Sequence, residues 1–566
     1  MAGPNKKVSA LIIGGGPVGL LMAYQLARSG CSSECIYSRS SELLDQLGLV
    51  DDLLQECHVC RESYTYDSEG ERVVPGRVWN FVENIEGTRF DFAIMLRQQF
   101  IERCFRKHLA ALGVTLAVET ECMGFEVVDS SRVVSVLEDL KSGMKYTVES
   151  EYLIGADGGK SFVRRHLNIP FEGDTTQDKW IRVDGKVKTD LPTPRSYGSI
   201  ESPTHGNVLW APLDRNMTRI GYVFIPEQEA RHGGKLTQEA VVQEAIAAVK
   251  PFKLEFQTVE WWTLYVIGQR VASTYQPNPR ILLVGDACHT HSSGAAQGLN
   301  TGIHDATNLG WKLSLVLKGL ATPSLLETYN TERRSAAQRL ITFDRRISTL
   351  MANKWPVGEE PAPGETKDIN QVLASVFDDA AGYNTGLGIA YEGNILNQRA
   401  GGGEDVSVSV EVGHRAPDVE LLKPGTLEAT RSQAVTPNEA RFNVLVFVGD
   451  PRVSLRRIRL FSEFLSQNRE LEAGLGRAVA ADVVRMITIA SVGDTSVGTL
   501  EAMEGQAPFG AVYYDTKRTA HRRYGVDLRY GALVVVRPDG YVGFVAELSE
   551  KGGRAVEEYL GGFLVV

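Results

Sequence analysis

The stretch LIIGGGPVGL at residues 11–20 decides the fold of the N-terminal part of this chain. An apolar run leads into Gly14-x-Gly16-x-x-Gly19 and an uncharged segment follows, which predicts a buried parallel strand, a tight turn and a helix. Backbone N–H groups at such a turn and the positive end of the helix favour a pyrophosphate. Glycine turns after strands also serve close helix packing, so this motif alone leaves nucleotide binding open.

A second glycine-bearing stretch, RILLVGDACHTHSSGAAQGLN, occupies residues 280–300. Four apolar residues and Gly285 place Asp286 at the carboxyl end of a strand, where open α/β sheets bind ligands; capping of the following turn is its alternative role. The start of the next helix offers small residues and backbone N–H groups suited to the negative charge of a reduced isoalloxazine. Its residues are Ala296, Gln297, Gly298, Leu299 and Asn300. The two stretches together predict a flavin dinucleotide.

Composition excludes several other classes of protein. The chain has 566 residues, 43% hydrophobic and 23% charged, as expected for a globular protein of two or three domains. A net charge of −10 argues against a nucleic-acid partner. The apolar segment 8–27 contains four glycines and a proline, so we expect no membrane span or targeting segment, and a cytoplasmic location. Cys57-x-x-Cys60 has metal or redox spacing but no second pair, so we predict no metal site.

The order of predicted elements divides the chain into five segments. Strand–helix alternation predicts a Rossmann-like domain over 1–176, to which the chain returns over 271–353. Short alternating runs over 177–270 predict an inserted mixed or antiparallel sheet, and the family resemblance given below implies that this sheet binds the substrate. Residues 354–411 are rich in Pro, Gly and Asn, as in a linker or excursion, and 412–566 predict a further α/β domain. The fold class is therefore α/β and α+β.

The chain resembles the FAD-dependent aromatic hydroxylases, which are the group A flavin monooxygenases. Within this family it is most similar to the phenol hydroxylase type. Besides the two glycine stretches, GADGGKS at 155–161 followed by Val163-Arg164 carries the likeness. WWTLYVIGQR at 261–270 is similar to phenol hydroxylases in particular. The likeness covers about residues 8–345. Residues 412–566 resemble the thioredoxin-like domain of phenol hydroxylases but contain no cysteine, which implies a structural role in a homodimer.

The resemblance implies roles for particular residues. Asp157 would contact FAD and the nicotinamide donor, with a tight Asp-Gly turn as the alternative. Tyr265 and Arg270 would be catalytic, Tyr265 over flavin and substrate; core packing and a salt bridge are their alternatives. The full set of implied cofactor contacts is Gly14, Gly16, Pro17, Val18, Gly19, Arg39, Gln98, Asp157, Asp286, Ala296, Gln297, Gly298, Leu299 and Asn300.

The implied reaction begins with reduction of bound FAD by NADPH. Oxygen then adds to give a flavin C4a-hydroperoxide, whose distal oxygen passes to a phenolic or polyketide-like aromatic ring. Tyr265 would relay the phenolic proton. Epoxidation, Baeyer–Villiger insertion or dearomatisation would use the same flavin chemistry. A non-catalytic scaffold that dimerises or binds a ligand is the alternative of another class.

One segment departs from the family. A dinucleotide fold usually has a ribose-binding acid at the end of its second strand, a position that falls here on Tyr37. Only Ser38-Arg39-Ser40-Ser41 then separates Tyr37 from Glu42, where the resemblance implies about twenty residues. Ribose binding would rest on Arg39 or on backbone. Either the natural chain has lost a loop with flavin contacts, or it has a segment that this sequence omits; an intact mass about two kilodaltons higher would show the latter.

Overall fold

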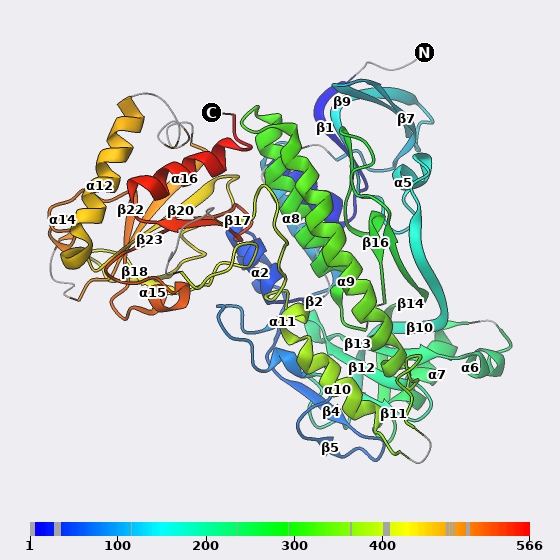
Figure 1. The fold of residues 1–566 in the computed structure, drawn as a ribbon. Helices are drawn as coiled ribbons and strands as arrows, with labels where there is room; N and C mark the ends of the chain where they lie inside the picture. The colour runs from blue at the N-terminus through cyan, green and yellow to red at the C-terminus, as the bar shows by residue number, and fades with distance from the viewer. Residues whose placement is uncertain are drawn as a thin grey trace.

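The computed structural model describes residues 6–27, 35–114, 116–234, 236–292, 294–362, 365–399, 408–470, 475, 478, 482–493 and 498–565. Two long helices, α8 (Gln297–Leu317) and α9 (Glu327–Met351), run side by side through the molecule (Figure 1). Two sheets lie along one side of this helix pair, and the C-terminal domain lies on the other side (Figure 1). The helix pair therefore connects the parts of the molecule.

The first sheet contains the predicted dinucleotide fold. β1 (Lys6–Ile13) and β15 (Ile281–Leu283) each pair in parallel with β9 (Lys145–Gly155). β8 (Arg132–Asp139) and β7 (Thr120–Asp129) extend this sheet in the antiparallel sense. α1 (Pro17–Ala27) follows β1 and packs against α8. The carboxyl ends of the parallel strands meet at one edge, the usual ligand edge of an open α/β sheet.

Among the described residues, the strand that follows α1 does not join the sheet of β1. β2 (Cys35–Ile36) pairs in the antiparallel sense with β6 (Ala93–Met95), whose other edge pairs with β3 (His58–Cys60). No described strand pairs with the outer edge of β1. Tyr37 N–H donates to Asn300 Oδ1 (3.0 Å), which fixes Tyr37 against α8. The place of Tyr37 at the ribose position therefore stays an expectation.

The second sheet has eight strands in the order β16-β14-β10-β13-β12-β11-β4-β5. Its two longest strands, β10 and β14, have 19 residues each and extend from the first domain into this sheet. α7 (Gln238–Ala248) covers the face that carries Ile181 and Val183. The strands are β4 (Ser63–Tyr66), β5 (Arg72–Val73), β10 (Phe171–Thr189), β11 (Tyr197–Ser202), β12 (Gly206–Pro212), β13 (Thr218–Phe224), β14 (Leu254–Ala272) and β16 (His289–Thr290).

Shorter helices fill the spaces around the two sheets. α4 packs against α1, and α10 packs against α9. None of the helices in the described part of the chain is long and apolar enough to cross a bilayer. These helices are α2 (Ser38–Gln46), α3 (Val50–Leu54), α4 (Gln98–Ala111), α5 (Phe162–His166), α6 (Pro226–Arg231), α10 (Ile369–Asp379) and α11 (Ala381–Asn384).

The C-terminal domain is a mixed sheet with helices, as expected. β20 (Phe442–Gly449), β21 (Val484–Ala490) and β22 (Ala511–Tyr514) are parallel, and β23 (Ala532–Val536) and β24 (Val542–Glu547) continue the sheet in the antiparallel sense. The order is β17-β24-β23-β20-β21-β22-β18-β19. The other elements are β17 (Gln398–Arg399), β18 (Glu420–Leu422), β19 (Ala429–Arg431), α12 (Pro451–Glu470), α14 (Thr499–Ala502), α15 (Thr519–Tyr524) and α16 (Glu550–Gly561).

Buried ion pairs join the helix pair to this domain. Glu332 on α9 accepts from Arg537 Nη1 and Nη2 (2.6 and 3.0 Å) and from Lys312 Nζ on α8 (2.9 Å). Asp539 accepts from the same guanidinium. Burial lowers the pKa of Lys312 to about 8, against the opposing effect of Glu332. Removing one member would leave a buried charge uncompensated, so this network fixes the C-terminal domain to the helix pair.

Candidate active site

A cavity of about 810 Å³ lies where the first sheet, the second sheet and the start of α8 meet. The carboxyl ends of β1, β9 and β15 contribute Gly14 to Val18, Ala156 to Gly158, Val284 and Asp286. The second sheet contributes Arg182, Tyr197, Leu209, Ala211, Leu213, Arg219, Val266 and Gly268. The cavity therefore unites the predicted cofactor turns with the face of the inserted sheet.

The glycines of the first motif divide into two roles. A Cβ on Gly14 (φ +122°) would lie 2.2 Å from the carbonyl oxygen of Ala156, and one on Gly19 would lie 2.0 Å from the carbonyl oxygen of Gly14. Both glycines therefore permit close backbone packing. A Cβ on Gly15 or Gly16 would meet nothing within 4 Å, and both line the cavity. The backbone is thus open to a phosphate at Gly15 and Gly16; Gly19, predicted as a contact, serves helix packing instead.

Asp157 belongs both to a turn and to the cavity. Its Oδ2 accepts from Val163 N (3.0 Å) and so caps the start of α5. Its Oδ1 is buried and has no hydrogen-bond partner among the described residues. Because a buried carboxylate oxygen needs a donor, Oδ1 fits a hydroxyl group of a bound ligand. Asp157 can therefore both stabilise a turn and contact a bound cofactor, the two roles that the sequence offered as alternatives.

A buried network holds the turn that carries Asp286. Asp305 Oδ2 accepts from Gly285 N (3.2 Å) and lies 2.7 Å from His289 Nε2, while its Oδ1 accepts from Arg333 Nε (2.7 Å). Burial alone would raise the pKa of Asp305, but Arg333 and His289 hold it below its ordinary value. Asp305 therefore stays ionised and fixes the turn, while Asp286 is exposed to the cavity.

The residues at the start of α8 separate into cavity residues and anchors. Ala296, Gly298 and Leu299 line the cavity. Gln297 instead donates to the carbonyl oxygen of Asn384 (2.8 Å). Asn300 donates to the carbonyl oxygen of Cys35 (2.8 Å). Neither Gln297 nor Asn300 is among the described lining residues, so their side chains position α8 and β2 around the site.

The expectation for Arg39 is wrong. Its side chain is fully buried, pairs with Glu42 (2.9 Å) and donates to the carbonyl oxygen of Asp539 (2.5 Å). The guanidinium also lies 5.1 Å from the ring centroid of Tyr541. Arg39 therefore faces the C-terminal domain, because α2 turns its first residues toward that interface. Gln98, by contrast, lines the cavity, and its contact with the cofactor stays a prediction.

The two predicted catalytic residues lie on β14 beside the cavity. Tyr265 is paired with Trp180 in the strand register, and its ring centroid is 5.9 Å from Arg182 Cζ. Arg270 donates to Thr175 Oγ1 on β10 (2.6 Å). Neither is among the described residues that line the cavity, whereas their neighbours Val266 and Gly268 are. Their catalytic roles stay predictions.

Sequence reasoning missed the polar residues of the inserted sheet. Arg182 and Arg219 line the cavity, and Arg219 forms a bidentate pair with Asp184 (2.7 Å for both bonds). Tyr197 also lines it, and burial raises the pKa of its hydroxyl well above the ordinary value. The available signal was a basic residue inside the otherwise half-apolar run Trp180 to Asp184. Only the strand register shows that it faces the cavity.

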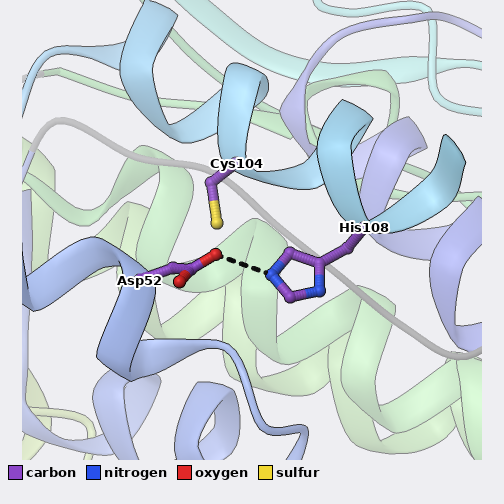
Figure 2. A group of neighbouring side chains, drawn as sticks. All are labelled: Asp52, Cys104 and His108. Carbon is purple, nitrogen blue, oxygen red and sulfur yellow. Dashed lines mark hydrogen bonds and ion pairs between the residues drawn. The ribbon is translucent and has the colours of Figure 1, made fainter. Parts of the chain in front are cut away.

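A separate cluster contains three ligand-type side chains (Figure 2). Cys104 and His108 stand one turn apart on α4, and Asp52 lies opposite on α3, with ligand atoms within 4.8 Å of one another. Lys107 Nζ is 2.6 Å from Asp52 Oδ2, and His108 Nε2 is 3.0 Å from the same oxygen. Burial raises the pKa of Cys104 to about 12, which disfavours the thiolate that a metal requires. An ion pair explains the cluster, and the absence of a metal stays a prediction.

The residues of the cavity fit the central part of FAD, which consists of its pyrophosphate and its polyol chain. Open backbone at Gly15 and Gly16, a partnerless Oδ1 on Asp157 and the exposed Asp286 provide the donors and acceptors that a pyrophosphate and a polyol chain need.

Comparisons with known proteins agree with this site. The FAD binding domain family matches residues 7–344, and the family of the phenol hydroxylase C-terminal dimerisation domain matches 389–566. The chain is 27% identical to phenol 2-monooxygenase fsqG of Aspergillus fumigatus, over 97% of this chain and 95% of the relative. It is 26% identical to 3-hydroxybenzoate 4-monooxygenase of Comamonas testosteroni, over 99% and 95%.

Solved structures show the same fold. The flavin-dependent monooxygenase PieE in complex with FAD and substrate matches with a TM-score of 0.71 at 20% identity, covering 99% of this chain and 100% of that one. Aklavinone-11 hydroxylase with FAD and aklavinone matches with a TM-score of 0.70 at 22% identity, covering 98% and 99%. With a family match over more than half of its length, the chain belongs to the FAD-dependent aromatic hydroxylases of the phenol hydroxylase type and is a flavin monooxygenase.

Proposed function

We propose that this monooxygenase uses NADPH and O2 to hydroxylate a phenolic or polyketide-like aromatic compound. The supporting observation is the single cavity that joins Gly16 and Asp286 to the sheet residues Tyr197 and Leu209. FAD, when bound, supplies the redox and oxygen-activating chemistry. The protein must then hold the cofactor and the ring in one water-poor space.

Cavity residues from the first domain hold the cofactor in this proposal. The backbone at Gly15 and Gly16 would receive the pyrophosphate of FAD, because it leaves space where a side chain would stand. Asp286 would accept a hydrogen bond from a hydroxyl of the ribitol chain, and Asp157 Oδ1 would accept one from a further hydroxyl. Backbone N–H groups at Gly298 and Leu299 belong to the first turn of α8 and would stabilise negative charge on the flavin.

Residues of the inserted sheet hold the substrate. Leu209, Ala211 and Leu213 provide an apolar wall that excludes water. Tyr197 stays protonated and can donate a hydrogen bond. Tyr265 relays the phenolic proton, because a phenolate ring is the better nucleophile. Arg270 donates to Thr175 Oγ1 and so ties β14 to β10, and its catalytic role stays a prediction.

Isotope labelling tests the proposal. Protein loaded with FAD is given NADPH, a panel of phenols and ¹⁸O₂, and we expect NADPH consumption with one labelled oxygen in the product. Consumption of NADPH with no label in any product would refute a monooxygenase reaction. Product structure separates hydroxylation from epoxidation, Baeyer–Villiger insertion and dearomatisation.

A variant pair tests the role of Tyr265. We expect Tyr265→Phe to lower turnover of a phenol by about 100-fold or more, the usual contribution of a positioned acid or base. Tyr64→Phe is the matched control, because the Tyr64 hydroxyl bonds an exposed glutamate outside the cavity. Equal turnover by the two variants would remove Tyr265 from the catalytic residues.

A further inference from the structure

The turn that leads into α8 contains a strained residue at the cavity. Ala296 stands directly before α8 and has φ +51° and ψ +34°, a left-handed conformation that residues other than glycine avoid. It lines the cavity together with Gly298 and Leu299 of the first helical turn. Such a conformation persists only where the surrounding structure enforces it. Another part of the molecule must therefore hold Ala296 in place.

Tyr37 holds this turn at two points. Its hydroxyl donates to the carbonyl oxygen of Ala295 (3.2 Å). Its backbone N–H donates to Asn300 Oδ1 (3.0 Å), and Asn300 Nδ2 donates to the carbonyl oxygen of Ala296 (2.9 Å). The first carbonyl belongs to the peptide group before the Ala296 Cα and the second to the peptide group after it. The two bonds together therefore fix φ and ψ of the strained residue.

The surroundings of Tyr37 keep its hydroxyl in position as a donor. Tyr37 is 1% exposed, and burial raises the pKa of its hydroxyl well above the ordinary value. Its ring packs edge-to-face against Phe81, with the two centroids 5.4 Å apart. Trp79, from the same segment as Phe81, donates from Nε1 to the carbonyl oxygen of Gly294 (3.0 Å). Two buried aromatic side chains thus fix the consecutive residues Gly294 and Ala295.

The orientation of this turn matters for the cofactor. Backbone N–H groups at the start of α8 would stabilise negative charge on the flavin only if the turn directs them to it. We propose that Tyr37 is a positioning residue for FAD, which keeps Ala296 left-handed and so holds the start of α8 in the orientation that binds the cofactor. Without the Tyr37 hydroxyl, Ala296 relaxes to an unstrained conformation, and the strain must be restored when FAD binds. This inference rests on the cofactor placement in the proposed function.

Titration of the apoprotein with FAD tests the role of Tyr37. An apparent dissociation constant rises in inverse proportion to the fraction of protein in the binding-competent conformation. The strain of a left-handed alanine makes that fraction about one in ten to one in a hundred, so we expect Tyr37→Phe to weaken FAD binding about 10- to 100-fold. Quenching of flavin fluorescence measures the dissociation constants.

A second buried tyrosine provides the matched control. The Tyr222 hydroxyl donates to the carbonyl oxygen of Val241 (2.7 Å), and Tyr222 is not among the described residues that line the cavity. Tyr222→Phe therefore removes the same kind of bond away from the turn. We expect this variant to bind FAD within about 3-fold of wild type.

The Ala296→Gly substitution identifies the cause of the loss. Glycine adopts the left-handed conformation without strain, so Ala296→Gly should restore FAD binding by Tyr37→Phe to within about 3-fold of wild type. Ala440→Gly is the control, because Ala440 is also left-handed (φ +55°) but lies just before β20 in the C-terminal domain. It should restore no binding. A merely structural role of Tyr37 would not respond selectively to Ala296→Gly.

Three results would overturn the proposal. They are FAD binding by Tyr37→Phe within about 3-fold of wild type, a loss that Ala296→Gly does not restore, and an equal gain from Ala440→Gly. If circular dichroism shows that Tyr37→Phe does not fold, Trp79→Phe takes its place with the same expected results, because it removes the donor to Gly294.

The design separates this inference from the proposed function. Its readouts are dissociation constants, so a protein that forms no ¹⁸O-labelled product can still show the loss and its rescue. If Gly16→Ala binds FAD as tightly as wild type, the cofactor placement fails and this inference fails with it. If Gly16→Ala weakens binding and Tyr37→Phe does not, only this inference fails.

Discussion

Replacing Glu42 with glutamine should destabilise the contact between the first domain and the C-terminal domain. Glu42 on α2 is fully buried and accepts hydrogen bonds from Arg39 Nη1 (2.9 Å) and Arg415 Nε (2.7 Å). Burial by itself would raise the pKa of this carboxyl group, but Arg415 and Arg39 lower it from 4.5 to about 2. The difference of about 2.5 pKa units corresponds to about 3 kcal/mol of folding free energy.

The pH dependence follows from the direction of this shift. The folded pKa is depressed, so the stabilisation is fully present above the ordinary pKa near 4.5 and is lost as the pH falls toward 2. By pH 4 the wild-type protein should have lost about 1 kcal/mol of it. The Glu42→Gln variant has no carboxyl group that titrates at this position. The difference in unfolding free energy between wild type and variant should therefore shrink by about 1 kcal/mol between pH 7 and pH 4.

Urea denaturation followed by circular dichroism measures these quantities. Glu428→Gln is the control, because Glu428 forms an exposed pair with Lys423 (2.8 Å) and should change stability by less than about 1 kcal/mol. Limited proteolysis of Glu42→Gln should release the C-terminal domain faster than in the control. A variant as stable as the control at pH 7, or an unchanged difference at pH 4, would refute the reasoning.

Three further predictions concern the cofactor site and the assembly. Gly16→Ala should leave the free energy of unfolding unchanged and weaken FAD binding at least 10-fold. Gly19→Ala should instead lower the stability by about 1–3 kcal/mol, because its Cβ would lie 2.0 Å from a carbonyl oxygen. FAD titration and denaturation check both variants, and identical behaviour would contradict the division of roles. Asp344 accepts hydrogen bonds from Ser292 N and Oγ (2.7 and 2.5 Å) beside the cavity. Asp344→Asn should therefore raise the fraction of NADPH that is consumed without product. An unchanged ratio of product to NADPH would contradict this. The protein should form a homodimer through its C-terminal domain, so light scattering should give twice 62.1 kDa at micromolar concentration, and a monomer there would contradict it.

Local patterns were enough to predict the cofactor turns. Gly14-x-Gly16 follows an apolar strand, and Asp286 ends another, so both positions depend only on a few neighbouring residues. The structure places both at the cavity. The same local pattern could not tell a cavity side chain from an anchor. Gln297 and Asn300 turn to Asn384 and Cys35, which lie far away in the sequence.

The sequence alone determined the class of protein, its fold and the turns that are predicted to hold FAD, because glycine turns, strand ends and helix starts are properties of short segments. Tertiary structure decided which side chains face the cavity. Arg39 turns to the C-terminal domain, and Arg182 turns to the cavity. The physical reason is that both orientations depend on pairing between distant segments: α2 against the loop at Asp539, and β10 against β13 and β14.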